Sequence, residues 1–294
     1  MFGNTLKPSQ TRLRQQAMGP AHLPERGARR EKMIPDPLIL VNEGDGLRPV
    51  ALWVNDEFMA PPRTLAEQEK LSAELLSTQR GFPLYLNGEI QNYFYPQTFH
   101  GNPESCTSHG LWTGNVERSI TRPLLSVSAD FPGSKRYAGN YPDKKMLAAA
   151  VPLAKKVFLS KGLSNTDLKR FRTRQRTAFT LANGTRYFVA IEAEVSHPQN
   201  PCPEASLLLI VEKVGHRYQQ RLLNYRHNGA QCGTYRFVSS FSTDKRTNHI
   251  LVQGIANGAR WYDIYAGQAD RFVQRFHGAG HNCPPPDLVT PNPN

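Results

Sequence analysis

Hydrophobic and polar residues follow a helical spacing in two stretches of the first half of the chain. Residues 64–81 carry a stripe of leucines, and Thr64 followed by Glu67 fits the capping box that begins many helices. A second apolar stripe covers 143–162 and includes Pro152, which lacks the amide donor that a helix interior needs. The pattern therefore predicts two helices, the second kinked or divided at its proline.

Short extended runs dominate the rest of the chain and are separated by turn signals. Asn-Gly pairs at 87–88, 183–184 and 257–258 each lie between two strand-like runs, which is typical of hairpins. Gly215 marks a further reversal between apolar and mixed runs. The sequence thus predicts an α+β fold, in which a helix-containing N-terminal region is followed by a mainly antiparallel β-sheet or sandwich domain.

Two of these hairpins resemble each other. Residues 182–188 read ANGTRYF, and residues 256–262 read ANGARWY, 74 positions later. A tandem duplication of a β unit would produce this likeness, and so would convergence of two Asn-Gly hairpins. Two units are too few to close a propeller, so an open sheet or sandwich is favoured.

Composition divides the chain into four segments. Residues 1–32 form a basic arm that we expect to be disordered, 33–162 an α+β domain, 163–283 a mainly β domain, and 284–294 a proline-rich tail. At 294 residues the chain is near the size at which single cores stop growing. No run approaches the roughly 20 apolar residues of a transmembrane helix.

Positive charge is concentrated in two stretches of the chain. Of the net +12, residues 1–32 contribute +5 from 7 basic and 2 acidic residues, and 144–186 contribute +10 from 11 basic and 1 acidic residue. Such a field attracts nucleic acid, acidic polysaccharide, lipid headgroups or an acidic protein. The charge alone does not choose among these partners.

The densest basic stretch, KRFRTRQR at 169–176, has an arginine at every second position. In a strand these side chains would share one face at a spacing of about 6.6–7 Å, whereas in a helix they would scatter. The alternative is an exposed edge strand whose charges prevent aggregation. The predicted anion-binding residues are Arg170, Arg172, Arg174, Arg176, Lys155 and Lys156.

The cysteines leave disulfides, zinc and free thiols open. Three pairings are compatible with four cysteines, and we favour Cys202–Cys232 as the local disulfide and Cys106–Cys283 as the long one. A zinc site using Cys106, Cys283 and nearby histidines is less favoured, because its parts lie about 170 residues apart. No metal and no cofactor are therefore predicted.

Disulfides indicate an oxidising compartment, so we expect a periplasmic or extracellular protein, with the cytoplasm as the alternative. The basic arm at 1–32 has no apolar core of a secretory signal. A leader removed before this sequence begins would reconcile the two observations.

Part of the β-rich region resembles a known family. The segments FTLANGTRYFVAIEA (179–193) and FVSSFSTDKRTNHILVQG (237–254) are similar to the FG-GAP or VCBS type of bacterial extracellular β repeat. That family has aspartate-rich calcium loops, but here one loop has Leu181 to Asn183 and the other only Asp244, so calcium binding is not expected. The resemblance implies an exported protein with a non-catalytic binding or scaffolding role.

Motifs of familiar enzyme classes are absent from the sequence: there is no GxSxG, HExxH, phosphate loop or dinucleotide fingerprint. Glu192 and Glu194 would share a strand face and could act as an acid–base pair, although solvated surface carboxylates explain them more simply. His277, followed by His281 and Cys283, could bind a metal or act as a base, or lie in a surface loop. Whether the protein is an enzyme stays uncertain, with binding favoured.

The three tryptophans have two interpretations. Trp53, Trp112 and Trp261 could line a ligand pocket, but large aromatics most often pack in cores.

The leading hypothesis is an exported, non-catalytic protein that binds an acidic protein, a cell-envelope polymer or another subunit of an envelope assembly. The alternative is an intracellular nucleic-acid-binding protein that uses basic residues within 12–32 with the arginine row. A secreted hydrolase or nuclease using His277 and His281 is a second alternative. Oligomeric state is not readable from the sequence.

Overall fold

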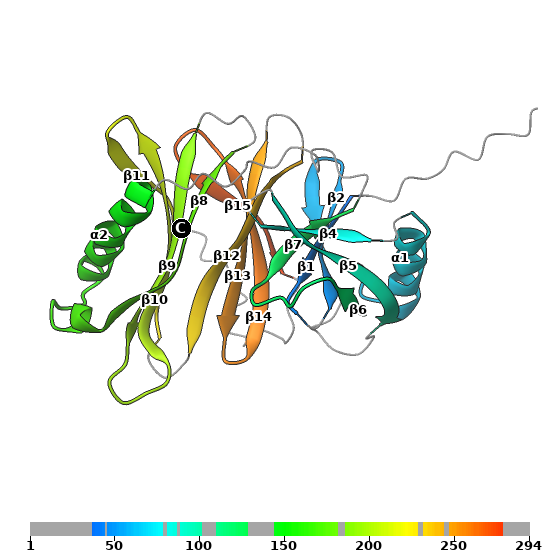
Figure 1. The fold of residues 1–294 in the computed structure, drawn as a ribbon, viewed down its shortest axis with the longest axis horizontal. Coiled ribbons are helices and arrows are strands. Elements are labelled where there is room, and N and C mark those ends of the chain that lie inside the picture. The colour runs from blue at the N-terminus through cyan, green and yellow to red at the C-terminus, as the bar shows by residue number, and fades with distance from the viewer. Residues whose placement is uncertain are drawn as a thin grey trace, which may run out of the picture. The chain divides into compact units, whose positions relative to one another are not determined.

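The computed structural model places the described residues in the compact unit Pro35–Asn294 (Figure 1). It describes residues 37–44, 46–78, 81–86, 89–101, 110–128, 144–181, 186–228, 232–243 and 247–278. In these residues the strands form three antiparallel sheets, accompanied by two α-helices in the N-terminal part. The predicted α+β class with a mainly antiparallel β region is confirmed.

The first described sheet, sheet A, closes into a ring, because its strand β1 pairs with both β7 and β2. β3 extends the edge beside β2. The strands are, in ring order, β1 (Leu38–Asn42), β7 (Leu124–Val127), β4 (Phe82–Leu86), β5 (Glu89–His100), β6 (Leu111–Val116), β2 (Leu47–Val54) and the added β3 (Glu57–Met59).

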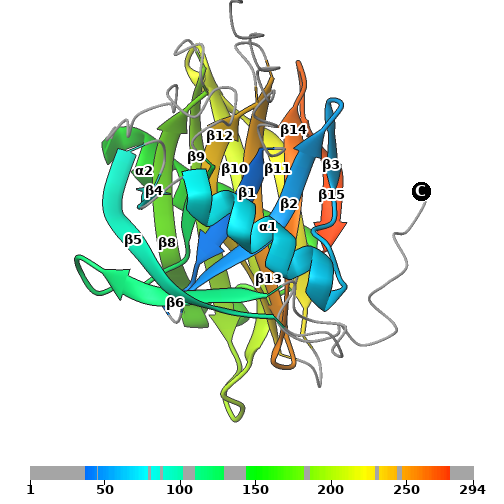
Figure 2. The same ribbon diagram turned by 90° about the vertical axis from the view of Figure 1, so that its right-hand side faces the viewer.

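Helix α1 (Leu65–Thr78) packs against sheet A and is seen in front of its strands in Figure 2. The predicted capping box is present, since Thr64 Oγ1 donates to Glu67 Oε2 at 2.7 Å and accepts from the Glu67 amide at 3.4 Å. Leu75 enters the apolar interior of the ring, where Trp112 donates from Nε1 to Ser72 Oγ at 2.9 Å. The helix therefore packs on the ring through Leu71 and Leu75.

Sheets B and C each contain four described strands in sequential antiparallel order. Sheet B consists of β8 (Phe171–Thr180), β9 (Tyr187–Ser196), β10 (Pro203–Val214) and β11 (Arg217–His227). Sheet C consists of β12 (Gly233–Ser242), β13 (Asn248–Ala256), β14 (Ala259–Gly267) and β15 (Phe272–Gly278).

Helix α2 (Lys144–Ser160) covers one face of sheet B, and a short 3₁₀ turn, η1 (Asp167–Arg170), follows it. Its buried residues recur every four positions, so one stripe faces the sheet. The helix is not divided at Pro152, which lies on the exposed side. The buried stripe is Met146, Ala150, Ala154 and Phe158.

Sheet C lies between sheet B and sheet A, and apolar clusters cover both of its faces (Figure 1). Ile250 and Val252 pack toward sheet B, whereas Leu251 packs toward sheet A. β1 is similar, because Leu38 and Leu40 face the ring interior while Ile39 and Val41 face sheet C. Strands buried on both faces lose the polar alternation that usually identifies a strand.

One of the predicted Asn-Gly turns lies within the described residues, and it has the expected hairpin geometry. Asn257 and Gly258 join β13 to β14 with φ values of 49° and 81°, as a type I′ hairpin requires. The Asn-Gly dipeptides at 87–88 and 183–184 lie outside the described residues. The strands that flank each dipeptide are paired with each other in antiparallel orientation.

The proposed duplication and the proposed domain boundary between residues 162 and 163 stay predictions. Residues from both sides of that boundary share apolar clusters.

Candidate functional site

A β-bulge at Arg174 determines how the basic stretch is displayed. Thr173 is opposite Ala193 and Gln175 is opposite Glu192, so Arg174 is an extra residue in β8. An extra residue inverts the alternation of faces beyond it.

The arginine row expected on one face is consequently not present. Arg172 is opposite Glu194 and Arg176 is opposite Ile191, and these partners lie on opposite faces of β9. Arg170 is in the η1 turn, where its Nη2 reaches Asp167 Oδ1 at 2.8 Å and Glu204 Oε2 at 2.7 Å. Sequence periodicity predicted the strand but had no signal for the bulge.

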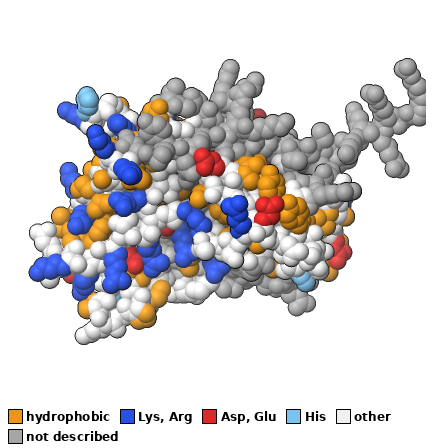
Figure 3. Space-filling view, viewed as in Figure 1, with side chains coloured by type: hydrophobic (Ala, Val, Ile, Leu, Met, Phe, Trp, Pro, Cys, Tyr) orange, Lys and Arg blue, Asp and Glu red, His pale blue; other side chains and the backbone are white. Residues whose placement is uncertain are grey.

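The two predicted lysines lie on α2 and are exposed. Lys155 Nζ is 5.2 Å from the centre of the Phe171 ring, a cation–π distance. On the face shown in Figure 3, Lys and Arg side chains gather over the half that carries α2 and sheet B. This part of the surface is therefore basic, as the local charge count predicted.

One predicted arginine, Arg174, also lines a cleft at the junction of the three sheets. The cleft has a volume of about 300 Å³. β12 contacts both β7 and β9 there, so residues far apart in the sequence converge. We call it the arginine cleft, and its lining consists of Thr121, Arg122, Pro123, Arg174, Gln175, Glu192, Arg236 and Phe237.

Glu192 is the carboxylate of the arginine cleft and is 5% exposed. Its Oε1 accepts a hydrogen bond from the Phe237 amide at 2.9 Å, the single hydrogen bond to this side chain within the described part of the chain. Burial raises the pKa of Glu192, whereas that bond and the positive charges of Arg122, Arg236 and Arg174 lower it in part. The carboxylate is thus held among cations that do not bond to it directly.

The guanidinium groups of the arginine cleft are only partly engaged. Arg122 donates from Nη2 to the Phe237 carbonyl at 3.0 Å, and its Nε is buried without a hydrogen-bond partner in the described residues. Burial also lowers the pKa of Arg122, while Glu192 opposes that shift. Arg174 donates from Nε to Glu194 Oε2, and its side chain is 43% exposed. A guanidinium has five N–H donors, so donors remain for an anion in the cleft.

The sequence did not identify Arg122 and Arg236 as site residues. Arg122 precedes β7 and Arg236 lies on β12, so 114 positions separate them, and no local spacing connects them. A signal did exist at Glu192, because the charged residues Glu192 and Glu194 interrupt the largely apolar run YFVAIEAEV, and a charged residue is expected to have partners when buried.

A second polar group surrounds His277, which was a candidate base or metal ligand. His277 Nδ1 is 2.6 Å from Asp263 Oδ1, and buried Asp263 also accepts from Gln274 Nε2 at 2.9 Å and Trp261 Nε1 at 3.1 Å. The hydrogen bond to Asp263 raises the pKa of His277 above its ordinary 6.5. Such a carboxylate fixes the orientation of an imidazole.

The described residues give the metal hypothesis no support, because nowhere among them are three His, Cys, Asp or Glu side chains close enough together to hold a metal ion. His281, Cys106 and Cys283 lie outside the described residues.

The tryptophans divide between core and surface. Trp112 and Trp261 are buried. Trp53 lines a hollow of about 580 Å³, together with Phe58 and buried His249, between the β2–β3 hairpin and sheet C. The core interpretation therefore holds for Trp112 and Trp261, whereas Trp53 borders a hollow and a ligand pocket there stays a prediction.

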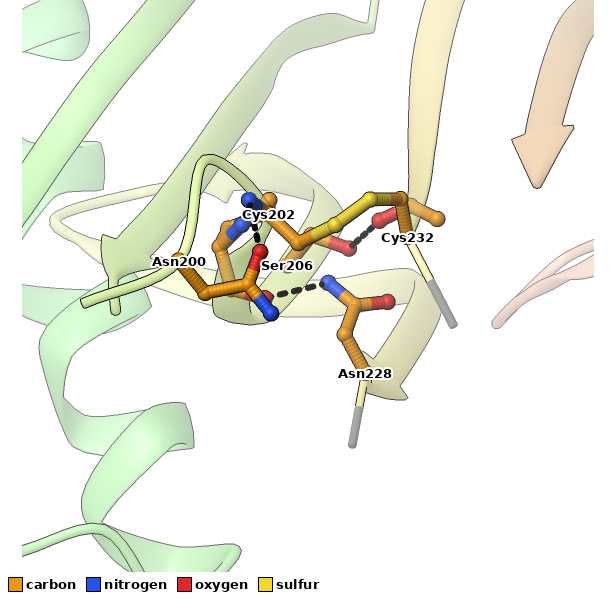
Figure 4. The surroundings of a disulfide bond; sticks show 7 residues. Asn200, Cys202, Ser206, Asn228 and Cys232 are labelled. Carbon is orange, nitrogen blue, oxygen red and sulfur yellow. Dashed lines mark hydrogen bonds between the residues drawn. A yellow bond between two sulfur atoms is a disulfide. The ribbon is translucent and has the colours of Figure 1, made fainter. Parts of the chain in front are cut away.

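The predicted disulfide Cys202–Cys232 is present, with a Cα–Cα distance of 5.1 Å (Figure 4). Hydrogen bonds surround it: the Cys202 amide donates to Asn200 Oδ1 at 3.0 Å, and Ser206 Oγ donates to the Gly233 carbonyl at 2.7 Å. The bond ties the segment before β10 to the start of β12, the strand that carries Arg236. A disulfide favours an oxidising compartment.

Comparison with known proteins gives no relative: no family model, curated protein or solved structure matches the chain. The resemblance of 179–193 and 237–254 to FG-GAP or VCBS repeats accordingly stays a prediction. Neither described helix has the length and apolar character required to cross a membrane.

Proposed function

We propose that this protein is an exported, non-catalytic binding protein that recognises an anionic group on an acidic protein or a cell-envelope polymer. The observation that carries the proposal is the arginine cleft, where Arg122, Arg174 and Arg236 surround a hollow with Glu192 as its carboxylate. Guanidinium groups bind oxyanions through paired N–H donors, and partial burial strengthens such bonds.

Two further features support the proposal. The exposed lysines of α2 lie on the sheet B half of the molecule, where Lys and Arg gather on the face shown in Figure 3, and would attract a polyanion from a distance. The Cys202–Cys232 disulfide supports export, since such bonds persist in oxidising compartments.

The test measures binding of a fluorescent sulfated oligosaccharide at about 0.15 M salt, close to physiological ionic strength. Arg236→Gln should weaken binding by about tenfold to a hundredfold, the cost of a charged hydrogen bond. Arg176→Gln removes the same charge from an exposed position outside the cleft and should change affinity by less than about threefold. Equal losses in the two variants would show that general charge, and not the arginine cleft, binds the polymer.

Nucleic acid is tested in the same format. A single-stranded DNA that binds more tightly than the sulfated oligosaccharide, and that loses binding in Arg236→Gln, would replace the envelope polymer by the nucleic-acid alternative.

A hydrolase is the second candidate, favoured by the Asp263–His277 pair. Turnover of chromogenic phosphodiesters or esters that disappears in His277→Gln would support it. A chain without turnover on these substrates would leave the binding function.

A further inference from the structure

Glu192 restricts which anions the arginine cleft can bind, because its carboxylate lines the same hollow. An anion entering the cleft would meet the Glu192 carboxylate as well as the three guanidinium groups. Two negative charges in one partly buried site repel each other, unless one of them is protonated. The chemistry of the cleft therefore depends on the proton of Glu192.

The lining also limits the shape of the ligand group. Arg174 lies on β8 of sheet B, Arg236 lies on β12 of sheet C, and Arg122 lies in the loop before β7 of sheet A, so the three guanidinium groups come from three separate parts of the chain. A planar carboxylate offers two oxygens, whereas a sulfate or phosphate monoester offers three, which matches the number of guanidinium groups that line the cleft. A volume of about 300 Å³ is at the small end of ligand pockets and suits a charged headgroup.

We propose that the arginine cleft binds a tetrahedral oxyanion group, a sulfate or phosphate ester, and that Glu192 takes up one proton from solvent when this group binds. This inference rests on the proposed function and specifies its ligand. No covalent bond changes; the proton adds to a carboxylate oxygen of Glu192, and the guanidinium groups that faced its charge turn their donors to the ligand.

The charged groups facing Glu192 come from each element packed around it. They are Arg122 before β7, Arg174 on β8 and Arg236 on β12, while Glu194 lies on the same face of β9 and is paired with Arg174. Burial already raises the pKa of Glu192, and a bound anion adds negative charge, which raises that pKa further. Affinity therefore increases as the pH falls through the interval between the two pKa values, by at most about tenfold per pH unit for one proton.

The experiment is calorimetric titration of the full chain with inorganic sulfate, whose charge is constant between pH 5.5 and 7.5. Each pH is measured in two buffers of different ionisation enthalpy, so that proton uptake is read directly from the difference in heat. Wild type should bind sulfate more tightly at pH 5.5 and take up protons. Glu192→Gln should bind with equal affinity at both pH values and without proton uptake, and Arg176→Gln should behave like wild type.

The outcomes separate this inference from the proposed function. Sulfate binding without proton uptake in wild type would overturn the inference, and this measurement does not depend on whether Glu192→Gln folds. An oligosaccharide that binds through Arg236 while inorganic sulfate does not bind would overturn the inference and leave the proposed function. If neither the oligosaccharide nor inorganic sulfate binds through Arg236, the inference and the proposed function are both overturned. Glucose 6-sulfate and glucose 6-phosphate, titrated in the same way, then show which ester the cleft prefers.

Discussion

Glu43 and Glu192 are both buried carboxylates between sheets with arginines nearby, but their hydrogen bonds differ. Glu43, which follows β1, accepts from Tyr262 Oη and Gln253 Nε2 at Oε1 and from Arg260 Nη1 at 2.8 Å at Oε2. Its side chain is 3% exposed. Glu192 accepts from one backbone amide and lies beside a hollow.

The difference in hydrogen bonding indicates that the ionic group around Glu43 is structural. Both oxygens of Glu43 have donors, so the network joins sheet A to sheet C and leaves little for a ligand. Glu212 is similar, because Arg186 binds both of its oxygens at 2.7 Å and Arg221 adds a bond at 2.6 Å. The arginine cleft instead has guanidinium donors in excess of the bonds to its carboxylate, and on this difference we base the proposal that it binds an anion.

The largest effect is expected from Glu43→Ala. Removing this carboxylate takes an acceptor from the buried Tyr262 hydroxyl and the buried Gln253 amide, at about 1–3 kcal/mol each, and from half-exposed Arg260, at up to about 1 kcal/mol. The expected loss is about 3–5 kcal/mol in all. Urea unfolding should show this loss, whereas Glu57→Ala, an exposed change on β3, should alter the free energy of unfolding by less than about 0.5 kcal/mol. Similar values for the two variants would remove the structural role of Glu43.

A slightly smaller loss of folding stability is expected when the disulfide is removed by the double change Cys202→Ser and Cys232→Ser. The bond closes a loop with a sequence separation of 30, for which chain entropy gives about 3–4 kcal/mol. Because the bond anchors the start of β12, sulfate binding through Arg236 should also weaken. A variant with unchanged guanidinium-chloride unfolding would show that hydrogen bonds around Ser206 and Asn200 suffice.

Glu192→Gln should have the opposite sign to Glu43→Ala at neutral pH. A carboxyl whose pKa is raised by folding binds more protons in the folded state, so it lowers stability as the pH rises above the unfolded pKa and through the folded one. The glutamine side chain of the variant does not titrate, so it adds no dependence of stability on pH. Unfolding measured from pH 5 to 8 should give a smaller decrease with pH for the variant than for wild type; a steeper decrease would contradict the burial argument.

The smallest effect concerns the pair formed by half-exposed His277 and buried Asp263. Asp263→Asn should lower the pKa of His277 toward 6.5, as read from its ring protons by NMR. Because folding raises the pKa of His277, the pair stabilises the fold fully below pH 6.5, and the contribution disappears as the pH rises through the folded pKa. An unchanged pKa in the variant would show that Asp263 only positions the ring.

Local features were predictable from the sequence, whereas contacts between sheets were not. The capping box at Thr64 and the hairpin at 257–258 follow from short-range spacing, and both are present. The Cys202–Cys232 bond is also present, but the sequence allowed three pairings and only favoured this one. The bulge at Arg174 involves no glycine or proline, so nothing in KRFRTRQR signals it. The position of sheet C between two other layers, and the meeting of Arg122 with Arg236, depend on packing that periodicity does not encode.

The measurement that tests the contrast most directly is crystallography with selenate, a tetrahedral oxyanion located by its anomalous signal. The account predicts a peak in the arginine cleft within hydrogen-bond reach of Arg122, Arg174 and Arg236, and none beside Glu43 or Glu212. The peak should vanish in Arg236→Gln and persist in Arg176→Gln. A cleft without selenate, in crystals where other arginines bind it, would contradict the claim that this group of cations is open to an anion.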